Sequence, residues 1–154
     1  MGSGGVSSLK RLRAQALGAL DRARPGALLL GRLAVGLLFV STGWGKVHNI
    51  PKVTQFFQTL GIPAPGFHAV LVAYSELLCG TALVIGLLSR LATIPLIVSM
   101  IVALITAKHA DIHGVFDLVG QDEFTYLVVL VMIAVIGPGK LSLDHLIARR
   151  IDEA

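Results

Sequence analysis

Four long apolar runs, almost free of charged residues, place the strongest constraint on what this chain can fold into. They cover residues 27–47, 67–88, 91–107 and 122–137. A helix needs about 20 apolar residues to cross ~30 Å of hydrocarbon, so the first two runs have the length of membrane spans. The third is shorter, and the fourth reaches a comparable length only if its helix begins at Asp122. We therefore predict an all-α integral membrane protein, with four spans packed as an antiparallel bundle.

The overall composition agrees with a membrane location and excludes several classes of protein. Of the 154 residues, 55% are hydrophobic and 14% charged, whereas soluble domains average about 45–50% and about 25%. The single cysteine, Cys79, excludes an internal disulfide, a Cys-x-x-Cys redox pair and a Cys-x-x-Cys-His haem attachment. We find no phosphate-binding loop and no Ser-His-Asp set. The chain is therefore not expected to be catalytic on its own.

The apolar runs divide the chain into an arm, residues 1–26, a membrane domain, residues 27–145, and a tail, residues 146–154. Proline and glycine around residues 50–51 and 61–66 bracket a short helix predicted over residues 52–60. In the arm, Leu9, Leu12, Ala16 and Leu20 recur at helical spacing with Arg or Lys between them. This pattern predicts an amphipathic helix, lying either on the cytoplasmic leaflet or against another subunit.

The distribution of positive charge predicts the orientation in the membrane. Cytoplasmic loops are enriched in Lys and Arg. One end of the predicted bundle has ten of the 13 basic residues: Lys10, Arg11, Arg13, Arg22, Arg24, Arg32, Arg90, Lys140, Arg149 and Arg150. Lys46, Lys52 and Lys108 lie at the other end. Both termini are therefore expected in the cytoplasm, and the net charge of +4 needs no nucleic-acid partner to explain it.

Two charged residues lie inside the apolar runs, where a charge costs roughly 2.5–3.5 kcal/mol on insertion scales. Arg32 is in the first run and Glu76 in the second. Each shares a helical stripe with small residues, which let helices approach closely in lipid. We expect both stripes to face the interior of the bundle. We expect the two side chains to pair, directly or through one polar group. Such a pair either locks two helices together or forms a proton or quinone site.

The histidines are the other candidates for chemistry. His48, His68, His109 and His113 all map to the outer end of the bundle. If the third helix continues through them, His109 and His113 share one face, as ligands of Cu or Zn often do. The spacing is loose, and an ordinary hydrogen-bonded outer surface is the favoured interpretation. No metal is therefore assigned.

Taken together, the motifs resemble the DoxX family over most of the chain beyond the arm. Those that carry the resemblance are Arg32, Gly43-Trp44-Gly45-Lys46, Leu60-Gly61-Ile62-Pro63-Ala64-Pro65, Glu76, Gly80, Leu83-Val84-Ile85-Gly86-Leu87-Leu88-Ser89-Arg90 and Gly137-Pro138-Gly139-Lys140-Leu141-Ser142-Leu143-Asp144. The resemblance implies a small bacterial membrane protein, in some members a subunit of a thiosulfate:quinone oxidoreductase, in others a membrane partner of superoxide dismutase and a sulfurtransferase. It supplies no catalytic residues, so Lys46 and Arg90 enter only as charges that match the family pattern.

Three functions remain open at this point. The first is a subunit of a quinone-linked redox or oxidant-defence system, with quinone as the one cofactor considered and a soluble protein as redox partner. The second is a structural subunit that packs against a larger respiratory or photosynthetic complex in the bacterial cytoplasmic membrane. A small-solute transporter ranks last, because the four short spans show no inverted repeat.

Overall fold

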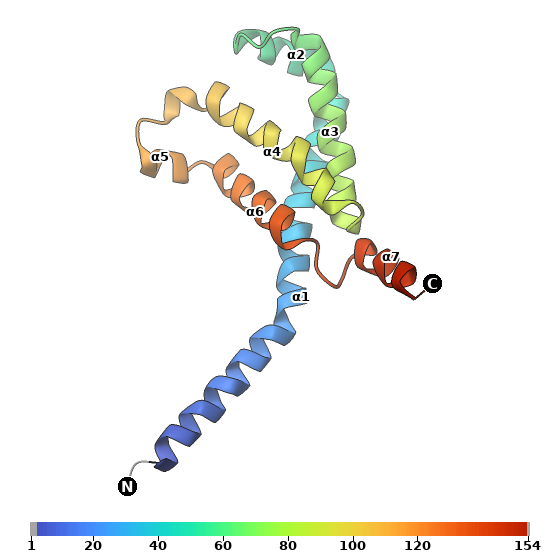
Figure 1. Cartoon of the computed structure of the whole chain (residues 1–154). Coiled ribbons are helices and arrows are strands. Elements are labelled where there is room, and N and C mark those ends of the chain that lie inside the picture. The colour runs from blue at the N-terminus through green and yellow to red at the C-terminus, as the bar shows by residue number, and fades with distance from the viewer. Residues whose placement is uncertain (1–2, 154) are drawn as a thin grey trace.

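All the regular secondary structure in the part of the chain that the structure describes is helical (Figure 1). The computed structural model describes residues 3–153, and for residues 3–8 and 152 it describes the backbone alone. The helices in that range are α1 (Ser3–Val47), α2 (Ile50–Thr59), α3 (Pro65–Ile85), α4 (Ser89–Thr106), the 3₁₀ helix η1 (His109–Asp111), α5 (Val115–Val119), α6 (Asp122–Ile136) and α7 (Leu143–Asp152). The short helix expected after the first span is α2.

Three of these helices are long and apolar enough to cross a membrane: α1 from Leu9, α3 and α4. Helix α3 packs along α1, α4 packs against α3, and α6 packs against α4 and touches α1. The 15 residues of α6 reach only about 22 Å at 1.5 Å per residue. Three spans are thus supported by length and composition, while the fourth crossing, and with it the exact four-helix bundle, remains a prediction.

Glycines make the contact between α1 and α3 close. A Cβ atom built on Gly36 would lie 2.9 Å from a side-chain carbon of Val84, and one built on Gly80 would lie 2.8 Å from the backbone of Val40. At Gly43 the added carbon would collide with the backbone of Leu77. Small residues are what allow helix backbones to approach in lipid. The predicted inward stripes of the first two spans are confirmed here.

The core is formed by the inner faces of α1, α3, α4 and α6. Phe39, Leu83, Leu96 and Leu130 are almost completely buried. Many large apolar side chains of the same helices, such as Leu78, Ile94 and Val135, are instead exposed on the outside. An apolar outer surface over apolar helices is the arrangement that lipid requires.

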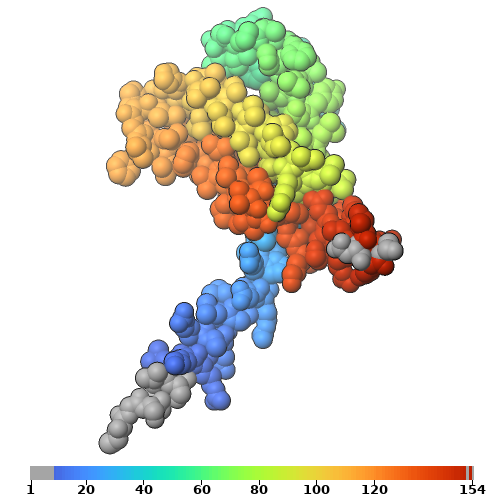
Figure 2. Space-filling view, viewed as in Figure 1, coloured from blue at the N-terminus to red at the C-terminus, as the bar shows by residue number. Residues whose placement is uncertain are grey.

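The helix predicted in the arm is present, and it is continuous with the first apolar span. Residues 8–24 form the first half of α1, which continues without interruption to Val47 and includes Pro25. The first half projects away from the other helices, and its axis changes direction near the start of the apolar segment (Figures 1 and 2). Proline in a helix removes one backbone hydrogen bond and bends the axis. Leu9, Leu12 and Leu20 remain 65–69% exposed along this arm.

Candidate functional site

A large cavity, with a volume of about 1100 Å³, lies at the end of the molecule where α2 packs on α3. Side chains from α1, α2, α3, α4 and α6 line it, and the space-filling view shows this end hollowed between α2–α3 and α4 (Figure 2). Most of the lining is apolar. The polar or ionisable side chains on its wall include Thr42, Lys46, Lys52, His68, Glu76, Glu123 and Tyr126.

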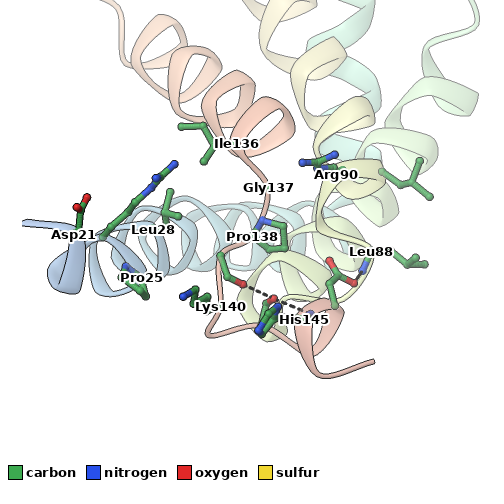
Figure 3. A pocket seen from close by; sticks show the side chains of 15 residues that line it. Asp21, Pro25, Leu28, Leu88, Arg90, Ile136, Gly137, Pro138, Lys140 and His145 are labelled. Carbon is green, nitrogen blue, oxygen red and sulfur yellow. Dashed lines mark hydrogen bonds between the residues drawn. The ribbon is translucent and has the colours of Figure 1, made fainter. Parts of the chain in front are cut away.

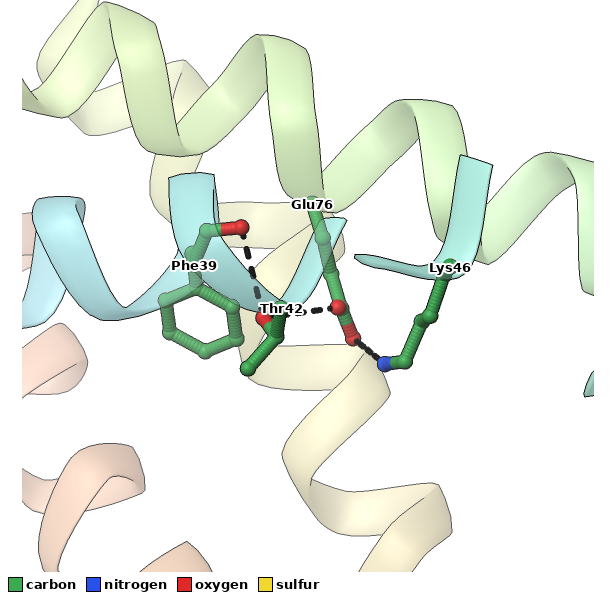
Figure 4. A network of polar contacts seen from close by, with 4 residues as sticks. All are labelled: Phe39, Thr42, Lys46 and Glu76. Carbon is green, nitrogen blue, oxygen red and sulfur yellow. Dashed lines mark hydrogen bonds and ion pairs between the residues drawn. The ribbon is translucent and has the colours of Figure 1, made fainter. Parts of the chain in front are cut away.

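Glu76 is the buried charge of this wall, with 2% of its surface exposed. The ammonium of Lys46 forms an ion pair with Glu76 Oε1, and the Thr42 hydroxyl lies 3.0 Å from Oε2 (Figure 4). The same hydroxyl is 3.3 Å from the Phe39 carbonyl oxygen. With one proton to donate, it serves the nearer and charged acceptor. Both carboxylate oxygens of Glu76 are therefore satisfied by α1.

Gly43 places Glu76 against these partners. A Cβ atom at residue 43 would lie 2.9 Å from the carbonyl carbon of Glu76, so α3 crosses α1 at this level. Thr42 and Lys46 are four residues apart on α1, and side chains at that spacing lie on one face of a helix. The carboxylate thus meets one residue on each side of the crossing point.

The expected pairing of Arg32 with Glu76 is wrong. Arg32 lies 11 residues before Gly43, about 16 Å along the axis at 1.5 Å per residue, and its side chain cannot cover that distance. It is 2% exposed, and its Nη1 and Nη2 donate to the carbonyl oxygens of Pro138 and Leu141, both at 2.9 Å. Arg32 therefore holds the segment between α6 and α7, at the opposite end of the bundle from the cavity.

The second charge of the family pattern, Arg90, also lies at that opposite end. Its Nη2 donates to the Val135 carbonyl oxygen at 3.4 Å. Nearby, Asp144 accepts hydrogen bonds from the backbone N–H groups of Leu88 and Ser89, at 2.6 and 2.9 Å. Arg90 thus has no part in the cavity, whereas Lys46 is central to it.

The four outer histidines are not gathered by the fold. Helix α4 ends at Thr106, so His109 lies in η1 and His113 in the loop beyond it. His48 Nδ1 contacts the Trp44 carbonyl oxygen at 2.9 Å, and His68 Nδ1 contacts that of Pro63 at 2.7 Å. Among the residues that the structure describes, no three His, Cys, Asp or Glu side chains cluster as metal ligands would. Of the four, His68 lines the cavity.

Sequence reasoning did not identify Thr42, Glu123 and Tyr126 as residues of this site. One feature of the sequence could have revealed Thr42. It lies four residues before Lys46, so the two side chains share one face of the first span. Glu123 lies 3.7 Å from the Lys108 ammonium, an ion pair that links the end of α4 to the start of α6. No local pattern reveals that contact, because η1, α5 and their connecting loops separate the two residues in the chain.

Beside this large apolar space, the ammonium of Lys46 can donate a hydrogen bond to a bound carbonyl group, and its pair with Glu76 can exchange a proton with that group. The apolar remainder of the wall favours a flat or hydrophobic ligand over a highly charged one.

The chain is similar to bacterial proteins, several of which are named as membrane proteins. It is 31% identical to "Uncharacterized membrane protein Rv3486" of Mycobacterium tuberculosis (strain ATCC 25618 / H37Rv), over 82% of this chain and 84% of that protein. It is 30% identical to "Inner membrane protein YphA" of Escherichia coli (strain K12), over 80% and 91%. It is 34% identical to "Putative oxidoreductase CatD" of Bacillus subtilis (strain 168), over 77% and 84%.

No solved structure matches the chain significantly. The DoxX family model matches residues 27–109, from the start of the apolar part of α1 to the end of α4 and the beginning of η1. That segment contains the glycine crossing of α1 with α3 and the Thr42, Lys46 and Glu76 contacts. With more than half of its length matched, and with relatives of this similarity, the chain belongs to the DoxX family of membrane proteins.

Proposed function

We propose that this protein is the quinone-binding membrane subunit of a redox or oxidant-defence system. The observation that carries the proposal is the cavity of about 1100 Å³ with the Glu76–Lys46 pair on its wall. Small-molecule sites are largely apolar, with a few convergent polar groups and volumes of about 300–1,000 Å³. A quinone ring with the first part of its isoprenoid tail fits that description.

The polar groups suit the two carbonyl oxygens of a quinone. Lys46 is 31% exposed beside the cavity, so its ammonium has hydrogens beyond the one directed at Glu76. Reduction to the quinol takes two electrons and two protons. Glu76 and Lys46 would relay protons, and the electrons would come from a partner protein that carries its own redox centre.

The family and one relative support a redox role. The resemblance to the DoxX family implies a relation to subunits of a quinone-linked oxidoreductase. The name of the Bacillus subtilis relative includes "oxidoreductase". The lone Cys79 cannot form a redox pair within the chain. A partner protein, soluble or membrane-bound, is therefore part of the proposal.

The test is binding of a short-chain menaquinone analogue to the purified protein in lipid nanodiscs, together with extraction of any co-purified quinone. The double variant Lys46→Gln/Glu76→Gln removes both charges at similar volume and is expected to weaken binding at least tenfold. Arg150→Gln, at an exposed cation outside the cavity, is the matched control. Equal binding by the double variant and the wild type, with both folded, would overturn the proposal.

A second role, as a structural subunit of a larger membrane complex, is favoured by the arm. The first half of α1 projects away from the other helices (Figures 1 and 2). Leu9, Leu12 and Leu20 are exposed along it. Purification from native membranes would detect such an assembly. Deleting residues 9–24 should release the partner if the arm is the contact, and a chain that purifies alone with a protease-sensitive arm would exclude this role.

A further inference from the structure

We propose that a second crevice, at the opposite end of the bundle from the cavity, binds the phosphate of an anionic phospholipid. The crevice has a volume of about 880 Å³ and lies between α1, the start of α4 and the segment that joins α6 to α7. Basic side chains reach it from four different segments: Arg24, Arg90, Lys140 and His145. None of them belongs to the proposed quinone site, so this proposal stands separately.

Arg90 is held at the crevice by the backbone beside it. Its guanidinium donates to the Val135 carbonyl oxygen at 3.4 Å and lies across Gly137. A Cβ atom at residue 137 would come within 3.2 Å of Arg90 Nη2, and the residue has a φ of +92°. Glycine suits this position for two reasons: it adopts a positive φ without strain, and it leaves room for the Arg90 guanidinium. The arrangement fixes a forked donor of the kind that recognises phosphate oxygens.

The charge balance of the crevice favours an anion. Asp144 lines it, but both of its oxygens already accept backbone N–H groups, from Leu88 and Ser89. Asp21 is the one other carboxylate among the described lining residues. Arg24 and Lys140 have no carboxylate within 4.0 Å in the part of the chain whose side chains are described. The lining thus offers two unpaired cations in addition to Arg90.

The position of the crevice favours a lipid over a free phosphate ion. Arg24 lies three residues before the first apolar run, Arg90 lies in the first turn of α4, and Lys140 follows the end of α6. These three points mark the boundary between polar and apolar segments, where lipid head groups lie. Figure 3 shows Leu28 and Ile136 bordering the same opening as Arg90 and Lys140. A phospholipid would use both the cations and the apolar wall, and a phosphate ion only the cations.

The experiment titrates the purified full-length protein in detergent with phosphatidylglycerol and counts bound lipids by native mass spectrometry. Parallel arms use phosphatidylethanolamine, which has no net charge, and inorganic phosphate as a competitor. A cation near an anionic lipid contributes roughly fivefold in affinity, so Arg90→Gln and Lys140→Gln are each expected to weaken phosphatidylglycerol binding about fivefold. Asp21→Asn is expected to strengthen it, because it removes a negative charge from the rim.

Arg150→Gln is the matched control, since Arg150 is an exposed cation of the same end that does not line the crevice. Helix content measured by circular dichroism establishes that each variant is folded. The proposal is overturned if Arg150→Gln weakens binding as much as Arg90→Gln does, or if the two lipids bind equally well. Displacement of phosphatidylglycerol by an equal concentration of inorganic phosphate would show that the ligand is a free anion, and would also overturn it.

Discussion

At the scale of single residues, the site depends on how a buried carboxylate is compensated. Glu76 is 2% exposed and has one cationic and one hydroxyl partner, both from α1. Removing one member of a buried ion pair leaves the other charge without compensation, which costs more than removing both. The second buried charge, Arg32, is compensated differently, by two backbone carbonyl oxygens.

This asymmetry predicts the behaviour of Lys46 variants. Lys46→Met is expected to lower the free energy of unfolding by about 2 kcal/mol. Breaking a fully buried ion pair costs about 3–5 kcal/mol, and the cost is smaller here because the lysine is 31% exposed. Adding Glu76→Gln should restore most of that loss. Reversible unfolding in detergent, followed by circular dichroism, measures both variants. A double variant less stable than Lys46→Met alone would contradict the explanation.

At the scale of helices, the close crossing of α1 and α3 sets which side chains meet. Gly43 is in contact with the backbone of α3, whereas a Cβ atom added to Gly31, on the same helix, would have no neighbour within 4 Å. The two glycines therefore offer a matched pair of substitutions. Their difference isolates the interhelical contact from the general effect of glycine in a helix.

Gly43→Ala is expected to destabilise the protein by about 1–3 kcal/mol, because the helices must separate to admit the methyl group. Gly31→Ala should instead raise stability by about 0.5–1 kcal/mol, the usual gain in a helix interior. The midpoint of thermal unfolding, compared for the two variants, checks both signs. Similar shifts for both substitutions would mean that the crossing tolerates separation.

The tight turn between α3 and α4 is a second feature that sets how the helices are arranged. Leu88 has a φ of +48°, which a leucine rarely adopts, and Asp144 holds the turn through the N–H groups of Leu88 and Ser89. The Asp144 N–H also donates to the Gly86 carbonyl oxygen at 2.9 Å. The start of α7 therefore fixes the turn, although more than 50 residues separate the two in the sequence.

Asp144→Ala is expected to cost about 1–3 kcal/mol, since two backbone donors lose their acceptor. Asp144→Asn keeps one acceptor oxygen and should cost about half as much. Hydrogen exchange at Leu88 and Ser89 reports the local effect, and Asp111→Ala, at an exposed carboxylate in η1, is the control. Unchanged exchange at the turn in Asp144→Ala would contradict this role.

At the scale of the whole molecule, the two ends of the bundle differ in charge and contents. The large cavity lies at one end, and the basic arm, Arg90, Lys140 and α7 lie at the other. Arg32 joins the apolar part of α1 to the segment that precedes α7. Asp144, at the start of α7, joins that helix to the α3–α4 turn. The excess of basic residues at that end predicts that it faces the cytoplasm.

The orientation is tested with single cysteines in a Cys79→Ala background. Lys52→Cys, on α2, should react with a membrane-impermeant maleimide added to intact spheroplasts. Arg150→Cys, on α7, should react only after the membrane is broken. The reverse pattern would place the termini outside and move the proposed lipid crevice to the outer leaflet.

Composition and periodicity along one chain were enough to predict the class of protein, the apolar helices, their inward stripes and the family. The partners of the buried charges, in contrast, depend on how the helices pack against one another. The level at which α3 crosses α1 depends on the Gly43 contact with Leu77, and that level brings Lys46 rather than Arg32 to Glu76. The continuous α1 and the hold of Asp144 on a distant turn likewise follow from the folded arrangement. Helical spacing specifies which face a residue occupies, and packing between helices specifies the depth at which two faces meet.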